Sequence, residues 1–252
     1  MIPLSLKIEN LIVPEGKIAC FWLGQAGFVF KTPDGKKIAV DPYFSDCCER
    51  YFGFKRIMPP VMNADDVEFD YLFVSHAHYD HFDPDSVPLM LQNGRTIGVL
   101  ALDCKEECTR LGIKTEGVTF IKTDEKFTDG KISVKAVKCD HGSLAPHAVG
   151  FLFELSGKKI YFTGDTANNP DCFSSPELHS ADLLILPING AFGNLNETEA
   201  ATVAGTLGAK NVLPCHFWNF KEHGGEPEKF FEAAGKNGIN AKLLAIGDYL
   251  LI

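Results

Sequence analysis

No hydrophobic run in this chain of 252 residues is long enough to span a membrane. Residues 1–10 lack the basic block and the apolar core of a signal peptide, so a cytoplasmic protein is expected. Positive charge is scarce: the chain has 24 basic and 33 acidic residues, which gives a formal net charge of −9. Because an acidic surface repels phosphate backbones, nucleic acid is not expected as a partner.

The eight cysteines include no CxxC pair, so the sequence does not predict a zinc ribbon. Without a signal peptide, free thiols are expected rather than a disulfide framework. The adjacent Cys47 and Cys48 leave a redox role or adventitious metal binding open. Ordinary thiols of a loop or of the core are the favoured interpretation.

The sequence also lacks a linker, a low-complexity segment and a convincing short-period repeat. Its hydrophobic share of 45% and charged share of 23% are those of an ordinary globular protein. The length is compatible with one large domain or with two small ones. A single domain over residues 1–252 is the simplest prediction.

Short β-rich runs dominate the first part of the chain, and strands alternate with helices in the later part. This order is typical of two sheets that pack together with helices outside. Strands are predicted at residues 18–23, 27–31, 37–40, 71–74, 96–100, 118–122, 132–137, 149–155, 159–162, 183–186, 211–214, 243–246 and 249–251. Helices are predicted at residues 85–92, 103–111, 196–207 and 227–236, and two of them begin with a capping box, Asp103 with Glu106 and Asn196 with Glu199.

Residues 43–69 show little periodicity but are rich in aromatic side chains. The aromatic residues of its first half are Tyr43, Phe44, Tyr51, Phe52 and Phe54. Two interpretations are equally supported: the segment covers a site, or it forms an irregular piece of the core.

Three histidines and an aspartate lie within six residues, namely His76, His78, Asp80 and His81. They follow the apolar run 71–74 and precede Asp83-Pro84, which resembles a helix N-cap followed by proline at the first helical position. A loop between a strand end and a helix start can direct several side chains at one point. Because imidazole nitrogen and carboxylate oxygen are preferred ligands of zinc-like cations, the cluster predicts a metal site rather than a solvated polar loop.

This HxHxDH pattern resembles the signature of the metallo-β-lactamase superfamily. Three later strands also end beside a histidine or an aspartate, in the order of that family's later motifs: His141, Asp165 and His216. The resemblance covers nearly the whole chain. It implies an α/β (α+β) fold, a four-layer αββα sandwich built on two mixed β-sheets.

The resemblance further implies two divalent metal ions, with zinc as the default and manganese as the alternative. Their implied ligands are His76, His78 and His141 for the first ion, Asp80, His81 and His216 for the second, and Asp165 as a bridge. Asp80, Asp165 and His216 are the predicted catalytic residues, around a hydroxide held between the ions. Asp41 is expected to orient a histidine ligand, although an ordinary Asp-Pro turn would also account for it.

Short segments at residues 22–27, 187–190, 196–200 and 214–217 resemble the L-ascorbate-6-phosphate lactonase group, and N-acyl-phosphatidylethanolamine phospholipase D is a more distant relative. The implied reaction opens a lactone or ester of a small sugar-like acid, with or without a phosphate group. The alternatives are a phosphodiesterase, of phospholipase D or cyclic-nucleotide type, and a non-catalytic metal-binding protein. A histidine at position 78, where flavodiiron relatives carry glutamate, favours hydrolysis.

A small anionic substrate is the expected partner, and association with further copies of the chain is left open. Four residues are candidates for contacting that substrate: Asn189, His147, His223 and Trp218. Each also has an ordinary structural interpretation, as a turn residue, a surface residue or a core residue.

Overall fold

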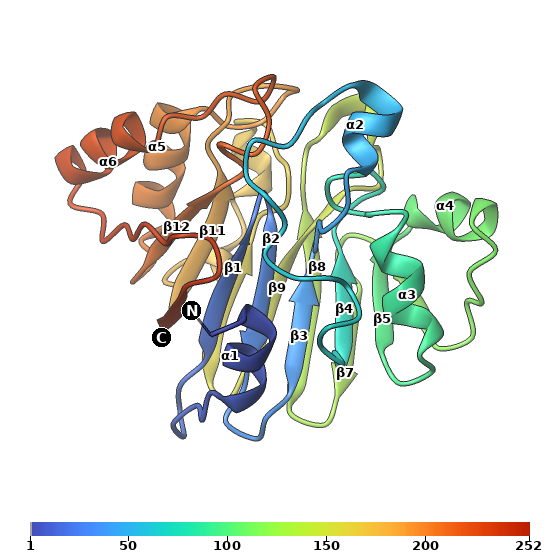
Figure 1. The fold of residues 1–252 in the computed structure, drawn as a ribbon. Helices are drawn as coiled ribbons and strands as arrows, with labels where there is room; N and C mark the ends of the chain where they lie inside the picture. The colour runs from blue at the N-terminus through green and yellow to red at the C-terminus, as the bar shows by residue number, and fades with distance from the viewer. Residues whose placement is uncertain (1) are drawn as a thin grey trace.

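A computed structural model describes residues 2–252 and contains two mixed β-sheets with helices on their outer sides (Figure 1), as the sequence predicts. The first sheet has the strand order β13–β1–β2–β3–β4–β5–β6, and the second has the order β12–β11–β10–β9–β8–β7. The strands of the first sheet are β1 Ala19–Gly24, β2 Gly27–Lys31, β3 Lys37–Val40, β4 Tyr71–Val74, β5 Ile97–Ala101, β6 Val118–Ile121 and β13 Tyr249–Leu251. Those of the second sheet are β7 Lys126–Asp129, β8 Ile132–Lys138, β9 Val149–Leu155, β10 Lys158–Phe162, β11 Leu183–Pro187 and β12 Val212–Cys215.

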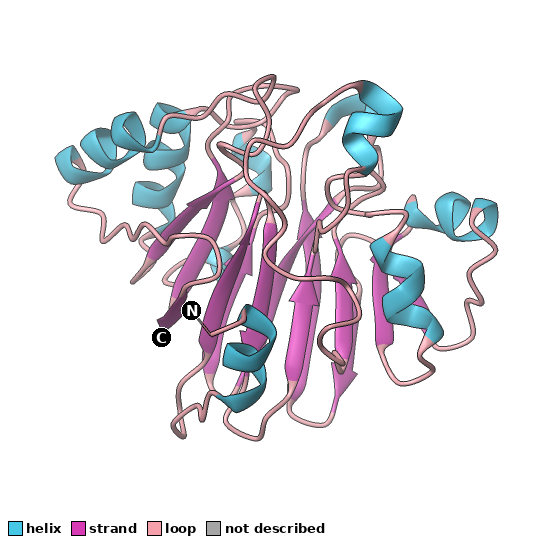
Figure 2. Cartoon of the chain, in the orientation of Figure 1, coloured by secondary structure: helices cyan, strands magenta, loops and turns pink. Residues whose placement is uncertain are grey.

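The helices lie outside the sheets, with α5 and α6 beside β11 and β12, and α3 and α4 beside β5 (Figures 1 and 2). Their bounds are α1 Leu4–Asn10, α2 Cys47–Phe52, α3 Ser86–Gln92, α4 Cys104–Arg110, α5 Glu197–Leu207 and α6 Pro227–Lys236, with short 3-10 turns at Gly142–Leu144, Pro170–Cys172 and Pro176–Leu178. Within residues 2–252, none of these helices has the length and apolar character needed to cross a membrane.

Aromatic side chains fill the space between the two sheets. Phe73 of β4 packs edge-on against Phe153 of β9 with ring centroids 5.1 Å apart. Phe30 of β2 contacts the same ring at 5.2 Å, and all three side chains are fully buried. Edge-to-face pairs of this kind add roughly 0.5–1.5 kcal/mol each to the stabilisation from hydrophobic burial. The main hydrophobic core of the protein includes these side chains between the two sheets.

Strand direction gathers the site-bearing loops at one edge. Strands β3 to β6 run parallel to one another, and so do β10, β11 and β12. Strand β8 shares the direction of β10 because both pair antiparallel with β9. The loops that follow β3, β4, β8, β10, β11 and β12 therefore collect at the carboxyl ends of the strands, where open sheets place their ligands.

Several local predictions differ from the structure. Residues 243–246 form no strand, because no neighbouring strand pairs with them, and the nearest pairing is an isolated bridge between Ala241 and Val212. Asp103 precedes α4 without capping it, since its own backbone is already helical and its carboxylate makes no capping hydrogen bond. The capping box of Asn196 and Glu199 is confirmed.

Helix α3 begins later than predicted, with Asp85 at the N-cap position. The carboxylate of Asp83 instead accepts hydrogen bonds from the backbone of Phe44 and Ser45 and from Ser86 Oγ. Asp83 therefore fastens the aromatic segment 43–69 to the loop that carries the histidine cluster.

Helix α1, helix α2 and strand β7 were not predicted. Helix α1 is held by the buried Lys31, whose Nζ donates to the carbonyls of Ile8 at 2.6 Å and Glu9 at 2.8 Å. Burial lowers the pKa of Lys31. A lysine near a helix C-terminus satisfies carbonyls that have no partner within the helix, and that contact depends on the tertiary structure.

Candidate metal centre

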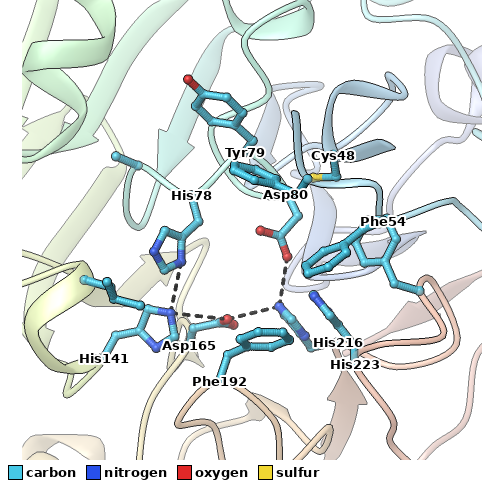
Figure 3. A pocket seen from close by; sticks show the side chains of 14 residues that line it. Cys48, Phe54, His78, Tyr79, Asp80, His141, Asp165, Phe192, His216 and His223 are labelled. Atoms are coloured by element: carbon cyan, nitrogen blue, oxygen red, sulfur yellow. Dashed lines mark hydrogen bonds and ion pairs between the residues drawn. The ribbon is translucent and has the colours of Figure 1, made fainter. Parts of the chain in front are cut away.

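Side chains from four separate loops converge at the carboxyl edge of the sheets (Figure 3). The residues brought together are His76, His78, Asp80 and His81 after β4, His141 after β8, Asp165 after β10 and His216 after β12. They are the seven positions for which the sequence predicts ligands.

Three histidines form one group within this constellation. The ligand atoms of His76, His78 and His141 all lie within 4.8 Å of one another, and His141 Nε2 is 3.1 Å from His78 Nδ1. His76 Nε2 is buried and has no hydrogen-bond partner among the described residues. A buried imidazole nitrogen without a partner is costly, and a divalent cation bound at this point would satisfy it.

A second group contains both histidines and carboxylates. His216 Nε2 lies 3.0 Å from Asp165 Oδ2 and 3.2 Å from Asp80 Oδ2. His81 Nε2 lies 3.4 Å from Asp165 Oδ2 and 3.6 Å from Asp80 Oδ2. Two imidazoles and two carboxylates in one buried place are a donor set that fits a borderline divalent cation.

Asp165 stands between the two groups. Its Oδ2 is within 3.4 Å of both histidines of the second group and 3.8 Å from His141 Nε2 of the first. Gly164 precedes it with φ of 65°, and a Cβ there would lie 2.9 Å from the carbonyl oxygen of Val149. Only glycine fits that turn without strain, so the turn fixes the direction of the Asp165 carboxylate.

Asp41 sits behind His81 and is fully buried. It accepts hydrogen bonds from Ser75 N at 2.7 Å and from Ser75 Oγ at 2.5 Å, and its Oδ2 is 2.7 Å from His81 Nδ1. A carboxylate beside Nδ1 keeps the proton on that nitrogen and leaves Nε2 free to bind a cation. This geometry is what the orienting role predicted for Asp41 requires.

Two amide side chains complete the surroundings of the ligands, and neither was predicted. Gln25 Nε2 donates to Asp80 Oδ2 at 2.8 Å, and Gln25 O accepts from His216 N at 3.0 Å. Asn194 Nδ2 donates to Asp165 Oδ2 at 2.7 Å. Gln25 lies in the segment 22–27 that resembles the lactonase group, and this resemblance could have indicated its role. No motif in the sequence indicates a role for Asn194.

The backbone is unusual at the same edge. Among the described residues, eight other than glycine have positive φ. Four of them belong to the site or line it: Gln25, Asp41, Phe192 and His216. Left-handed backbone is rare for such residues and gathers at functional sites, where the surrounding structure holds it in place.

The carboxylates divide the histidines into two classes. Burial keeps the pKa of His76, His78 and His141 below the usual histidine value. Burial also opposes protonation of His216, but Asp165 and Asp80 outweigh it and raise the pKa of His216 to about 9. Without cations, the histidines of the first group are therefore neutral at pH 7, whereas His216 of the second group is protonated.

This division predicts different proton release at the two groups. Cation binding to the second group should displace protons at pH 7, so its affinity should rise with pH up to about 9, where His216 is already half deprotonated. Binding to the first group should release almost none. Calorimetric titration with Zn²⁺ at pH 6, 7.5 and 9, each in two buffers of different ionisation enthalpy, measures the affinity and the proton release of each binding event. Equal proton release from the two binding events at pH 7.5 would contradict the assignment.

A cavity of about 480 Å³ opens beside the ligands, within the usual size range of small-molecule sites. His78, Asp80, His141, Asp165 and His216 form one side of it. The other lining residues are Cys48, Phe52, Phe54, Ala77, Tyr79, Leu144, Phe192, Phe220 and His223. Of the residues the structure describes, no lysine or arginine lines this cavity.

The four substrate candidates are placed differently. His223 lines the cavity and stacks on His216, with ring centroids 4.9 Å apart. Asn189 is buried outside the lining, and its Nδ2 donates to the carbonyl of Ala191. His147 is exposed outside the cavity, and Trp218 borders a different hollow, so the structure does not bring these two to the site.

The aromatic segment 43–69 fits both interpretations offered by its sequence. Tyr43 and Phe44 are buried, whereas Phe52 and Phe54 line the cavity. All eight cysteines are free, and Cys48 is the one that lines the cavity.

Comparisons with known proteins found a matching family model, sequence relatives and similar folds. Residues 20–216 match the family model of the beta-lactamase superfamily domain. A UPF0173 metal-dependent hydrolase of Korarchaeum cryptofilum is 29% identical over 89% of this chain and 94% of its own, and one of Rubrobacter xylanophilus is 30% identical over 88% and 90%. Igni18, a metallo hydrolase from Ignicoccus hospitalis, has a similar fold, with a TM-score of 0.74 at 18% identity over 94% of this chain and 98% of that one.

Proposed function

Because this chain belongs to the beta-lactamase superfamily, we propose that it is a metal-dependent hydrolase with two divalent cations, Zn²⁺ or Mn²⁺, that cleaves a carboxylic ester or lactone. The observation that carries the proposal is the position of Asp165 Oδ2, within 3.8 Å of ligand atoms from both groups. A shared carboxylate offsets the repulsion between two neighbouring cations. The complete donor set also argues against a purely structural cluster.

Each residue of the centre has a definite task in this proposal. When bound, two divalent cations would supply a hydroxide nucleophile at neutral pH and would polarise the carbonyl group of the substrate. His76, His78 and His141 would hold the first cation, Asp80, His81 and His216 would hold the second, and Asp165 would serve both. Asp41, Gln25 and Asn194 fix the ligands in direction.

His223 is the residue best placed to act on the substrate directly. Burial and the neighbouring His216 lower the pKa of His223 to about 4, so its ring is neutral at pH 7. Gln25 Nε2 lies 3.1 Å from His223 Nδ1, and a bond donated there leaves the proton on Nε2. A neutral imidazole with that tautomer can donate a hydrogen bond to a substrate oxygen.

A panel of substrates tests the proposal. Protein reconstituted with Zn²⁺ or Mn²⁺ should hydrolyse carboxylic esters or lactones and should lose that activity on chelation, with about two cations per chain by elemental analysis. Sugar-acid lactones with and without phosphate, phosphodiesters and β-lactams complete the panel. Cleavage of phosphodiesters alone would replace the proposal by the phosphodiesterase alternative, and failure to bind cations would remove it.

A further inference from the structure

The cavity has one side formed by ligands and another formed by apolar side chains (Figure 3). We infer that the apolar side receives an uncharged aryl or alkyl group of the substrate, next to the bond that is hydrolysed. The inference rests on the proposed function and adds the chemical class of the substrate. That class differs from the small anionic sugar-like acid expected from the sequence.

Phe54 stands at the centre of the apolar wall. Its ring centroid lies 5.9 Å from that of Phe192, 6.1 Å from that of Phe220 and 5.8 Å from that of His223. His223 in turn stacks on the ligand His216. The wall is therefore a continuous aromatic surface that begins at the metal centre. A flat or extended apolar group lying on it would hold its attached carbonyl beside the ligands.

Large apolar side chains at the mouth of the cavity are exposed, although most such residues in this chain are buried. The exposed fractions are 57% for Phe52, 55% for Phe192 and 79% for Leu144. Leu144 follows His141 by three residues, and Phe192 precedes Asn194 by two. Grouped exposed apolar side chains indicate a binding surface. The loops that carry or orient the ligands also carry Leu144 and Phe192, so a molecule that covers these two side chains would lie beside the ligands.

The cavity offers an anionic substrate few partners. Arg56, in the segment beside it, donates to the carbonyls of Tyr43, Ser45 and Met58 and stacks on the Tyr43 ring. Arg50 pairs with Asp85. A phosphate on the substrate would therefore depend on the cations and on a hydrogen bond from His223, whereas an apolar group would contact the whole aromatic wall.

Ethyl esters of straight-chain acids, from acetate to octanoate, provide the first test. For the reconstituted enzyme, kcat/KM should rise about two- to fourfold with each added methylene, fourfold corresponding to about 0.8 kcal/mol for a fully buried CH₂. Proton release in weakly buffered solution follows the reaction. The dissociation constants of straight-chain hydroxamic acids, measured by calorimetry on the metal-loaded protein, should fall in the same proportion without any turnover.

Two variants connect the effect to the wall. Phe192→Ala and Leu144→Ala should each flatten the dependence of kcat/KM and of hydroxamate affinity on chain length, and should change the values for the two-carbon compounds least. Leu89→Ala is the matched control, because Leu89 in α3 is 53% exposed and lies outside the cavity lining. This variant should keep the full dependence. Circular dichroism confirms that each variant is folded.

The outcomes separate this inference from the proposed function. Ester hydrolysis without dependence on chain length, or a more than tenfold preference for short phosphorylated esters, would overturn the inference and leave the hydrolase standing. Hydroxamate affinity that rises with chain length and falls in the variants, without ester hydrolysis, would support the apolar subsite and contradict the proposed ester hydrolase. If Leu144→Ala instead dissociates an oligomer in sedimentation and leaves both dependences unchanged, the exposed side chains form a contact between copies and the inference is wrong.

Discussion

Asp165→Ala is expected to reduce the content of both cations and to lower kcat/KM by about 10³-fold or more. Asp165 Oδ2 is the acceptor that lies near both histidine groups, so its loss weakens both sites together. Several kcal/mol of transition-state stabilisation depend on two correctly held cations, and each 1.4 kcal/mol is about a factor of ten in rate. Elemental analysis after dialysis and steady-state kinetics measure the two effects.

His216→Ala is the comparison that gives this prediction its specificity. His216 contacts the second group, so its removal should reduce the cation content by about one per chain and leave the first site filled. Asp65→Asn, at an exposed position away from the cavity lining, serves as the neutral control. The bridging role of Asp165 is wrong if Asp165→Ala retains both cations, or if it loses the same single cation as His216→Ala.

Asp41→Asn should have the second largest effect, although it changes one atom. The amide that replaces Oδ2 would present hydrogens to Ser75 Oγ and His81 Nδ1, both of which now face a carboxylate oxygen. His81 would then accept at Nδ1 and carry its proton on Nε2, the nitrogen needed for the cation. Affinity at the second site should fall about 10- to 100-fold, the usual loss when the partner of a ligand histidine is removed.

The first site should be affected less, since a hydrogen bond connects Asp41 to His76 only through Ser75, whose Oγ donates to Asp41 and lies 3.0 Å from His76 Nδ1. Titration with Zn²⁺, monitored by competition with a chromophoric chelator, resolves the two affinities. Asp182→Asn is a matched control, because Asp182 accepts from Lys159 N and Lys210 Nζ and takes no part in the cavity. If Asp41→Asn leaves the cation affinity of the second site unchanged, Asp41 does not orient His81 and is an ordinary turn residue.

The convergence of the seven candidate ligands could be predicted because its information is local. Each candidate lies a few residues after an apolar strand, and the carboxyl ends of strands that run in the same direction meet at one edge of the sheets. The amides that hold the ligands could not be predicted in the same way. Asn194 lies in a loop where asparagine is common for conformational reasons alone, and its contact with Asp165 spans 29 residues. Nothing in the sequence distinguishes that asparagine from an ordinary turn residue.

The apolar wall shows the same limit on a larger scale. Phe54 and Phe192 are 138 positions apart, so their contact depends on the tertiary structure that places the segment after α2 beside the site. Helix α2 has six residues, too short to be stable by propensity alone, so its formation depends on tertiary packing. The predicted strand at 243–246 failed for a related reason: an apolar alternation there packs on the core without a neighbouring strand to pair with.

The left-handed residues around the metal centre have a consequence for the lifetime of the protein. Gln25, Asp41 and His216 hold conformations that cost roughly 1–3 kcal/mol each, so we expect the loops of this edge to open first when cations are absent. Cations that bind only the closed form add stability by mass action. We therefore expect proteases to cut the metal-starved chain first at this edge and to spare the loaded one, so that metal supply controls the abundance of the protein as well as its activity.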